Sequence, residues 1–413
     1  MEVKVLSNWE SIYEKRLGGS IYERMFGIRP VINATGTSTN LGGSLMPKCA
    51  SDAWVEASKH FVPLEELLEK ACARVAKLCG VPAAHITSGA DAALTLMSAA
   101  CMTGNDRKKM KRLPDTEFMK NEFIRCRGMA THYEQAYRRA GAKWVVVGGS
   151  IVIVPTPLQA KEINSNEFRV IGVTLKEIEE AITDKTAALV HTYSWFSVQQ
   201  GIPSLKEMAE LSHNYGIPVI VDAAAQIPPP SRTRKYVDEG ADLVAFSGGK
   251  CLRGPNDVGL IVGQKDLVEA CAMQSSPNSG IGRGFKASKE DIVAAVVAWE
   301  WYFDWFSEEI TSKRMKKMSF VLKAFKDCAN VKPYLVYPDE TDCPIPMVYL
   351  QLDEKALGIT ASEVMMKMRN GTPPITLRGG YEQLGIFRIN SLFLEDGDEK
   401  IIVDRLKEVL IKN

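Results

Sequence analysis

Two residues of opposite charge follow short apolar runs in the middle of the chain. Asp222 ends the run Pro218-Val219-Ile220-Val221, and Lys250 follows Leu243–Gly249 through a Ser-Gly-Gly turn, 28 residues after Asp222. An unpaired carboxylate is costly after four apolar residues, so a cation should meet Asp222. The spacing fits one crossover between parallel strands with its loops. Both residues are therefore expected at the edge of a sheet where α/β proteins bind ligands.

A third strand end carries groups that suit an anion. Ile86-Thr87-Ser88-Gly89-Ala90 leads directly into a predicted helix, whose first amides have no partner inside the helix and can bind phosphate. An acid for a pyridinium nitrogen, a lysine for an aldehyde and a helix N-terminus for a phosphate are what pyridoxal phosphate requires. Taken singly, Asp222 could pair with a buried base, Lys250 could be a surface lysine and Ser88-Gly89 a plain helix cap. Their combination on one sheet favours the cofactor.

Other motifs for cofactors and metals fail on inspection. Gly249-Lys250 is no nucleotide-binding P-loop, since Val244 replaces the first glycine and Cys251 the Ser or Thr after the lysine. The glycine-rich segment Gly280–Gly284 does not follow a strand, which argues against a dinucleotide site. The five histidines show no ligand spacing, so no metal site is predicted.

The elements that must position these residues alternate along the central part of the chain. Thr174 with Glu177 and Ser204 with Glu207 form capping boxes that open two helices between apolar strands. This alternation predicts a mostly parallel sheet covered by helices. The predicted strands are Trp144–Val147, Ile151–Val154, Ala187–Val190, Pro218–Asp222, Asp242–Phe246 and Val258–Val262.

The flanking regions complete a three-part organisation. Residues 1–45 are expected to form an N-terminal arm and a substrate loop, 46–287 the large cofactor domain, and 288–413 a long linking helix and a small α+β domain. The small, polar run Val31–Gly43 is expected to be an ordered loop near a ligand or an ordinary turn. The segment Asn105–Glu122, with five basic residues between Arg107 and Arg112, is expected to be a solvated loop.

Further helices are predicted outside the central alternating segment, with apolar residues at helical spacing in the first of them. In the large domain they span Leu64–Leu78 and Asp91–Met102. The small domain is expected to contain strands Met347–Leu352 and Ile386–Asn390 together with the helix Ala361–Met368, followed by a final helix from about Asp398.

Composition excludes several classes of protein. The 413 residues are 46% hydrophobic, with 51 basic and 50 acidic side chains and a net charge of +1, which excludes global disorder and gives no footprint for nucleic acid or an anionic membrane. No signal peptide or transmembrane stretch is evident, and nine cysteines without a CxxC pair are expected to be reduced. The expected compartment is the cytoplasm.

Several short motifs together resemble the selenocysteine synthase-like group of fold-type I pyridoxal-phosphate enzymes, which includes D-glucosaminate-6-phosphate ammonia-lyase. The resemblance spans roughly residues 28–410 and implies the aspartate aminotransferase-like fold: a seven-stranded, mostly parallel sheet with a small α+β C-terminal domain. It implies pyridoxal 5'-phosphate as cofactor. The motifs are Val31–Thr37 with Asn40–Gly42, Thr87–Ala93, His191-Thr192, Val221–Ala224, Phe246–Lys250 with Gly254-Pro255, and Gly282-Arg283 with Lys286 and Lys289-Glu290.

The resemblance assigns roles around the cofactor. Lys250 is implied as the Schiff-base lysine and Asp222 as the partner of the pyridine nitrogen. His132 is implied to lie over the ring, although it could instead cap the helix that follows, and Met129 is close enough in register to be confused with it. The implied phosphate ligands are Ser88, Gly89, Ala90 and Ser247.

Further residues are implied for the substrate and for a second subunit. Arg378 is the expected clamp for a substrate carboxylate, with an exposed salt bridge as the alternative role and Arg388 as the second candidate. Arg283 and Lys286 are expected to reach the phosphate of a neighbouring subunit, so a homodimer or higher homo-oligomer is expected. The loop residues expected at the substrate are Asn33, Thr35 and Thr37.

The reaction expected from the resemblance is elimination. A small amino acid or amino-sugar acid would lose its α-proton and β-hydroxyl, giving a 2-oxo acid and ammonia. Racemisation or epimerisation is the close alternative, and transamination is less favoured. A cofactor-binding regulatory protein and a tRNA-dependent selenium transferase are the remaining alternatives; the near-zero net charge disfavours the latter.

Overall fold

In a computed structural model of the chain, the described residues are 18–129, 133–148, 172–194 and 201–411. Contacts divide the chain into two compact units. The small unit comprises Met1–Leu41 with Ser307–Asn413, and the large unit comprises Gly42–Phe306. The domain boundaries expected at 45/46 and 287/288 stay predictions. Among the described residues, no helix combines the length and apolar character needed to cross a bilayer.

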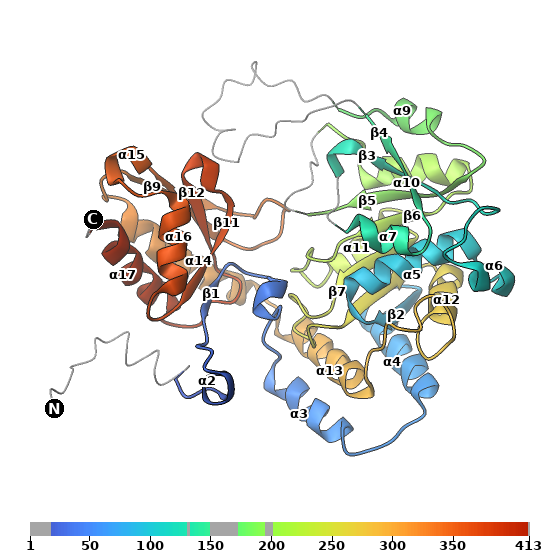
Figure 1. The fold of residues 1–413 in the computed structure, drawn as a ribbon, viewed down its shortest axis with the longest axis horizontal. Coiled ribbons are helices and arrows are strands. Elements are labelled where there is room, and N and C mark those ends of the chain that lie inside the picture. The colour runs from blue at the N-terminus through green and yellow to red at the C-terminus, as the bar shows by residue number, and fades with distance from the viewer. Residues whose placement is uncertain (1–17, 130–132, 149–171, 195–200, 412–413) are drawn as a thin grey trace. The chain divides into compact units, whose positions relative to one another are not determined.

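The large unit is built on a seven-stranded sheet in the order β2-β8-β7-β6-β5-β3-β4 (Figure 1). All neighbours pair in parallel except β8, which is antiparallel to both β2 and β7. This confirms the predicted mostly parallel sheet. The strand expected over 151–154 lies outside the described residues. The strands are β2 (Ala83–Thr87), β3 (Glu122–Cys126), β4 (Lys143–Val147), β5 (Thr186–Thr192), β6 (Val219–Asp222), β7 (Leu243–Ser247) and β8 (Gly259–Gly263).

Helices cover the two faces of this sheet. One face packs against α5 (Gly89–Thr103), α7 (Glu134–Arg139) and α12 (Lys265–Gln274), which share one buried apolar cluster with the strands. Helices α10 (Leu205–Asn214) and α11 (Arg232–Asp238) contact strands β5 to β8. In β7 the members of this cluster alternate along the strand: Leu243 and Ala245 belong to it, whereas Val244 between them does not.

Both predicted capping boxes are present in the large unit. The Thr174 and Ser204 side chains accept from the backbone amides of Glu177 and Glu207, and these glutamates in turn accept from the backbone amides of the two capping residues. They open α9 (Leu175–Glu180) and α10. Short helices between buried strands therefore begin where the sequence predicted.

The loop expectation for residues 105–122 was wrong. The basic run forms α6 (Arg107–Arg112), because the Asp106 carboxylate caps its first turn by accepting from the amides of Lys108 and Lys109 at 2.8 and 3.3 Å. Met110 is buried in the apolar cluster, which anchors the helix. The basic side chains lie on its exposed side. Composition alone therefore gives no indication that Met110 anchors a helix in this segment.

The remaining helices of the large unit pack together. The helix α13 (Lys289–Trp305), predicted to begin after Ser288, contacts α3 (Lys48–Ala57) and α4 (Leu64–Cys79). The Ser288 hydroxyl caps α13 by accepting from the Asp291 amide.

The small unit contains a five-stranded sheet in the order β1-β11-β12-β10-β9. Its first strand corrects an expectation, because Ile32–Ala34, expected in a loop or turn, form β1, which pairs in parallel with β11. Buried Ile32 and Ala34 provide the apolar side that this pairing needs. The strands are β1, β9 (Val331–Val336), β10 (Met347–Leu352), β11 (Ile375–Tyr381) and β12 (Ile386–Asn390).

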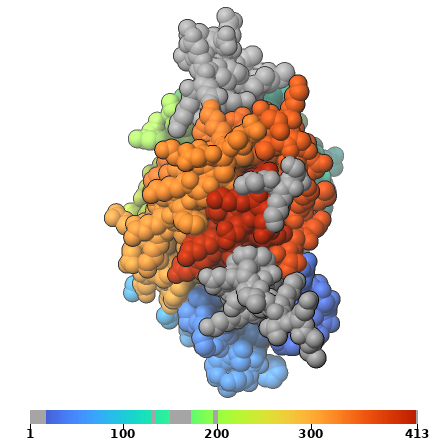
Figure 2. Space-filling view, turned by 90° about the vertical axis from the view of Figure 1, so that its left-hand side faces the viewer, coloured from blue at the N-terminus to red at the C-terminus, as the bar shows by residue number. Residues whose placement is uncertain are grey.

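Helices α14 (Glu308–Phe325), α16 (Ala361–Asn370) and α17 (Asp398–Ile411) pack on one face of this sheet and form its core. Two short helices, α2 (Ile21–Phe26) and α15 (Glu354–Leu357), complete the unit. In the space-filling view, α17 (red) lies at the surface beside α14 (orange) (Figure 2). The sequence pattern predicts α16 and α17 but neither α14 nor β9.

Strand alternation leaves a polar face on the other side of the small sheet. Phe387 and Ile389 belong to the helix-covered core. Their neighbours Arg388 and Asn390 must therefore point to the opposite face, where both are nonetheless buried, at 0% and 3% exposure. Buried polar side chains need partners, so this face is a candidate binding surface.

Candidate active site

Asp222 lies at the carboxyl end of β6, a strand that is buried throughout. It is 4% exposed and pairs across the sheet with Thr192 of β5 and Ala245 of β7. Its Oδ1 accepts a hydrogen bond from the Ala224 amide at 3.2 Å. Burial raises the pKa of this carboxyl, while the Ala224 amide and the nearby Lys250 oppose the rise. A cationic partner would relieve the cost of burying this carboxylate.

Lys250 lies in the turn that follows β7, and two side chains fix the path of that turn. The Trp299 indole donates to the Gly248 carbonyl at 3.3 Å, and the Ser44 hydroxyl donates to the Gly249 carbonyl at 2.9 Å. Burial lowers the pKa of the Lys250 amine, although Asp222 acts in the opposite direction. The lysine therefore has a larger neutral, nucleophilic fraction than an exposed lysine.

The start of α5 lies at the same sheet edge. Ser88 is the N-cap residue, but its hydroxyl makes no capping hydrogen bond, so the first amides of α5 keep no side-chain partner from the cap. Gly89 has φ +83°, which glycine adopts without strain and which turns the chain from β2 into the helix. Ala90 follows in the first turn of α5.

Strand register brings this helix start and Ser247 together. Thr87 and Ser247 both pair with Gly259 of β8, from opposite sides. Two strand spacings, about 10 Å, therefore separate the ends of β2 and β7, and β6 with Asp222 is the next strand along. Ser88, Ser247, Lys250 and Asp222 thus occupy one edge of the sheet, as the sequence predicted for the strand ends.

These groups fit pyridoxal phosphate. The amides of α5, with Ser88 and Ser247 beside them, suit the phosphate, a lysine of lowered pKa suits the aldehyde, and a buried carboxylate suits a protonated ring nitrogen. The role of each residue stays a prediction.

The identity of the residue that lies over the cofactor ring stays a prediction. His132 lies outside the described residues. Met129 is fully buried in the single turn Arg127–Met129. Tyr133, which no sequence motif indicates, is 43% exposed, and burial together with the nearby Asp222 and Asp91 raises the pKa of its phenol. Its place next to His132 was the only sequence signal for it.

The small unit holds the residues expected at the substrate. The Asn33 amide is used by its own loop: Oδ1 accepts from the amides of Thr35 and Gly36 at 3.0 and 3.2 Å, and Nδ2 donates to the Gly36 carbonyl at 3.0 Å. Gly36, at φ +82°, approaches Asn390 so closely that an added Cβ would lie 2.9 Å from its side chain. Thr37 follows, partly buried.

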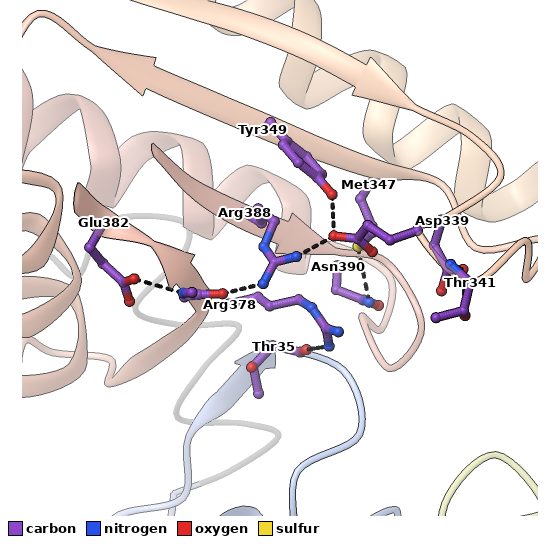
Figure 3. Close-up of polar contacts among 12 residues, drawn as sticks. Thr35, Asp339, Thr341, Met347, Tyr349, Arg378, Glu382, Arg388 and Asn390 are labelled. Carbon is purple, nitrogen blue, oxygen red and sulfur yellow. Dashed lines mark hydrogen bonds and ion pairs between the residues drawn. The ribbon is translucent and has the colours of Figure 1, made fainter. Parts of the chain in front are cut away.

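The Asn33 loop orients a carbonyl toward Arg378. Arg378 of β11 donates from Nη1 to the Thr35 carbonyl at 3.2 Å (Figure 3). Burial lowers the pKa of Arg378, and the neighbouring Arg388 lowers it further, while Glu340 opposes both effects. Arg378 lies within β11 and is partly buried.

Arg388 lies directly across from Arg378 in the antiparallel pair of β11 and β12. It forms an ion pair with Glu340 and donates to the Gly379 carbonyl (Figure 3). Its guanidinium carbon lies 4.5 Å from the centre of the Tyr381 ring. No sequence feature marks Glu340 as a partner of Arg388, since Pro338-Asp339-Glu340-Thr341 resembles an exposed turn.

The two basic residues expected to serve a neighbouring subunit, Arg283 and Lys286, are exposed in the loop after α12. Gly282 anchors this loop by donating from its amide to the Gln274 carbonyl at 2.9 Å.

The chain is similar to proteins of known activity over almost its whole length. Residues 141–324 match the family described as L-seryl-tRNA selenium transferase. D-Glucosaminate-6-phosphate ammonia lyase of Salmonella typhimurium (strain 14028s / SGSC 2262) is 30% identical over 391 residues, 94% of this chain and 98% of that protein. A Streptomyces 5'-C-glycyluridine monooxygenase-decarboxylase is 30% identical over 401 residues, 96% of this chain and 94% of that protein.

Solved structures agree with these similarities. The structure of D-glucosaminate-6-phosphate ammonia-lyase has a TM-score of 0.78 and 29% identity, covering 95% of this chain and 98% of that one. A Thermus thermophilus aspartate aminotransferase, with a TM-score of 0.53, 15% identity and coverage of 99% and 97%, shares the fold.

The fold is therefore the aspartate aminotransferase-like fold of enzymes that use pyridoxal 5'-phosphate, which confirms the predicted fold and cofactor. The chain belongs to the selenocysteine synthase-like family of these enzymes, as its motifs indicated.

Proposed function

We propose that this enzyme is an ammonia-lyase that removes the α-proton and the β-hydroxyl of a small amino acid or amino-sugar acid, giving a 2-oxo acid and ammonia. The observation that carries the proposal is the placement of Lys250 and Asp222 at one sheet edge, beside the uncapped start of α5. The similarity to an ammonia lyase over 94% of the chain supports the choice of reaction.

The residues of the large unit would hold the cofactor at three points. Ser88, Gly89, Ala90 and Ser247 would bind the phosphate, Asp222 would keep a proton on the ring nitrogen, and Lys250 would bind the aldehyde carbon. When bound, pyridoxal phosphate accepts the electron pair that remains at the substrate α-carbon after proton removal.

Once the substrate amine had displaced Lys250 from the aldehyde carbon, the freed lysine would carry the proton during elimination. Its amine, whose pKa is lowered by burial, takes the proton from the α-carbon as a base. The resulting ammonium can then donate this proton to the departing β-hydroxyl, which leaves as water. Addition of one water and release of ammonia give the 2-oxo acid, so the net reaction converts a 3-hydroxy-2-amino acid into a 2-oxo acid and ammonia.

Arg378 would bind the substrate carboxylate, and the Asn33 loop would hold that arginine in place. Its guanidinium is already oriented by the Thr35 carbonyl, 3.2 Å from Nη1. Arg388 is the weaker candidate, because its fork is committed to Glu340 and the Gly379 carbonyl. A planar arginine fork fixes a carboxylate with two parallel hydrogen bonds.

The test is a product screen with purified enzyme. A panel of 3-hydroxy amino acids and amino-sugar acids is assayed for ammonia and 2-oxo acid in equal amounts, with Lys250→Ala as the inactive control. Change of optical configuration without ammonia would replace the lyase by a racemase or epimerase, and amino transfer to a 2-oxo acid would replace it by an aminotransferase. Absence of turnover in the presence of bound cofactor would favour a binding protein.

We also propose that the enzyme is a homodimer or larger oligomer, in which the exposed Arg283 and Lys286 reach the phosphate of a neighbouring subunit. The variant Arg283→Gln with Lys286→Gln is expected to release cofactor more readily while light scattering gives an unchanged mass. A fully active monomer at working concentration would contradict the proposal.

A further inference from the structure

A cavity of about 430 Å³ lies in the large unit between α4, the edge strand β2 and α12. Small or apolar side chains from both helices form much of its wall, among them Leu68 and Ala76 of α4 and Val268 and Ala272 of α12. A volume of this size is typical of sites that enclose small molecules. None of the residues proposed to bind the cofactor lines it, so the cavity is separate from the candidate active site.

A buried histidine in the wall of this cavity has one nitrogen without a partner. His85 of β2 lines the cavity and is 4% exposed. Its Nδ1 lies 3.9 Å from the Sγ of Cys72 on α4, and this sulfur also accepts a hydrogen bond from the Ile86 amide at 3.4 Å. Its Nε2 is buried and has no hydrogen-bond partner in the part of the chain that the structure describes. Buried polar atoms normally have partners, so Nε2 marks a place where a further molecule can bind.

The protonation of this pair indicates which group suits Nε2. Burial lowers the pKa of His85 to about 4 and raises the pKa of the Cys72 thiol to about 11, so both groups are neutral near pH 7. In a neutral imidazole one nitrogen donates and the other accepts. Nε2 therefore donates if the thiol donates to Nδ1, and accepts if Nδ1 donates to the sulfur. A hydroxyl group suits both cases, because it can donate and accept.

The backbone of β2 adds a second polar group to the same wall. The Ile86 amide faces α4, since it donates to Cys72 Sγ. Backbone groups face alternate sides along a strand, so those of Ala84, another residue that lines the cavity, face the same outer edge of β2. A hydroxyl group that enters the cavity therefore meets a peptide group as well as the imidazole.

The charged residues around the cavity favour a neutral molecule. Those that line it are exposed and comprise three glutamates and one lysine, and Lys265 lies 3.8 Å from Glu269 in an ion pair. The remaining glutamates, Glu65 and Glu69, leave this rim negative, which disfavours an anion. Deeper in the cavity, the burial that lowers the pKa of His85 opposes positive charge, which disfavours a cation.

We propose that this cavity is a binding site for a small, neutral molecule with an apolar body and one hydroxyl group, a phenol or a similar alcohol, which hydrogen-bonds to His85 Nε2 and is enclosed by α4 and α12. The site goes beyond the proposed lyase reaction and does not depend on it.

The probes are p-cresol and toluene, which differ by one hydroxyl group. Their dissociation constants for the purified holoenzyme are measured by ligand-observed NMR titration. In the variant His85→Leu, the hydroxyl group loses its partner while the cavity stays apolar. We therefore expect the ratio of the p-cresol constant to the toluene constant to rise about 3- to 10-fold. The matched control is His60→Leu, which removes an exposed histidine and should leave the ratio unchanged.

A second variant tests whether the probes occupy this cavity. Ala272 lines it and is partly exposed, so the larger side chain of Ala272→Leu should fill part of the space. Both probes should then bind about tenfold less tightly or worse. If His85→Leu does not fold, a crystal structure of the wild-type enzyme with p-cresol decides the point. A hydroxyl oxygen within about 3.2 Å of His85 Nε2 would support the proposal, and any other position would overturn it.

Three results of the titrations would also overturn the proposal. An unchanged ratio in His85→Leu would mean that the histidine does not recognise the hydroxyl group. Binding that does not respond to Ala272→Leu would place both probes elsewhere. Absence of binding to the wild-type enzyme would mean that the cavity does not admit such molecules, as when a second copy of the chain covers it. The ammonia assay decides the lyase reaction independently of these outcomes.

Discussion

Replacement of Asp222 by asparagine is expected to reduce turnover far more than it weakens retention of the cofactor. The carboxylate is 4% exposed and ends a buried strand, so its partner is bound in a medium of low dielectric constant. An ion pair at about 3 Å contributes about 5 kcal/mol at an effective dielectric constant of about 20. Asparagine keeps a neutral hydrogen bond of about 1 kcal/mol. The difference, about 4 kcal/mol, predicts a loss of kcat on the order of 10³-fold.

The assay compares kcat with the dissociation constant of pyridoxal phosphate for the same preparations. The dissociation constant of pyridoxal phosphate should change less than about tenfold, because Ser88, Ser247 and the first amides of α5 are unchanged. Asp91→Asn is the matched control: this carboxylate lies near Asp222 but pairs with Arg139 at 2.6 Å. Similar, modest losses of turnover and of cofactor retention in Asp222→Asn would contradict this role and would mean that the carboxylate is structural.

Three other outcomes are expected. Lys250→Ala should abolish both the absorbance of covalently bound cofactor after dialysis and the adduct fixed by borohydride; an adduct that survives in the variant would assign the lysine elsewhere. Arg378→Lys should raise KM for a carboxylate substrate about 10- to 100-fold without changing cofactor absorbance, because a charged fork contributes about 1.5–3 kcal/mol; a silent Arg378→Lys with an impaired Arg388→Lys would exchange their roles. Burial lowers the pKa of His85 from 6.5 to about 4, so the unfolded chain takes up this proton first as the pH falls, and the free energy of unfolding should decrease by about 3 kcal/mol from pH 6.5 to below pH 4. Denaturant titrations of His85→Gln should give a flatter dependence, and equal slopes would contradict the assignment.

Sequence periodicity predicted the large unit well because its signals are local. The runs ending at Asp222 and Ser247 are continuous and apolar, as strands buried on both faces must be. Thr174 with Glu177 and Ser204 with Glu207 mark helix starts through hydrogen bonds within four residues. The alignment of Thr87 and Ser247 on Gly259 could not be predicted, because it depends on an antiparallel strand inserted between them.

Segments that depend on a distant partner were predicted less well. Ile32–Ala34 contains only three residues and becomes a strand because β11, over 340 residues later, pairs with it. The same holds for α6, whose basic composition predicts a solvated loop until Met110 is placed in the core. Local propensity is a weak guide wherever tertiary contacts decide.

The small sheet shows how a functional surface can be hidden by an ordinary pattern. Alternation in Ile386–Asn390 predicts one apolar and one polar face, and a polar face is usually taken to meet water. Here the polar members are buried, and burial turns Arg388 from a surface charge into a group that must be neutralised at a fixed place. Its partner Glu340 comes from a turn with no sequence signal, so no local reading could have distinguished Arg378 from Arg388. The two arginines differ in their contact with Glu340, which forms an ion pair with Arg388. Variants that change the charge of Glu340 are therefore more informative about this surface than further comparison of the two arginine motifs.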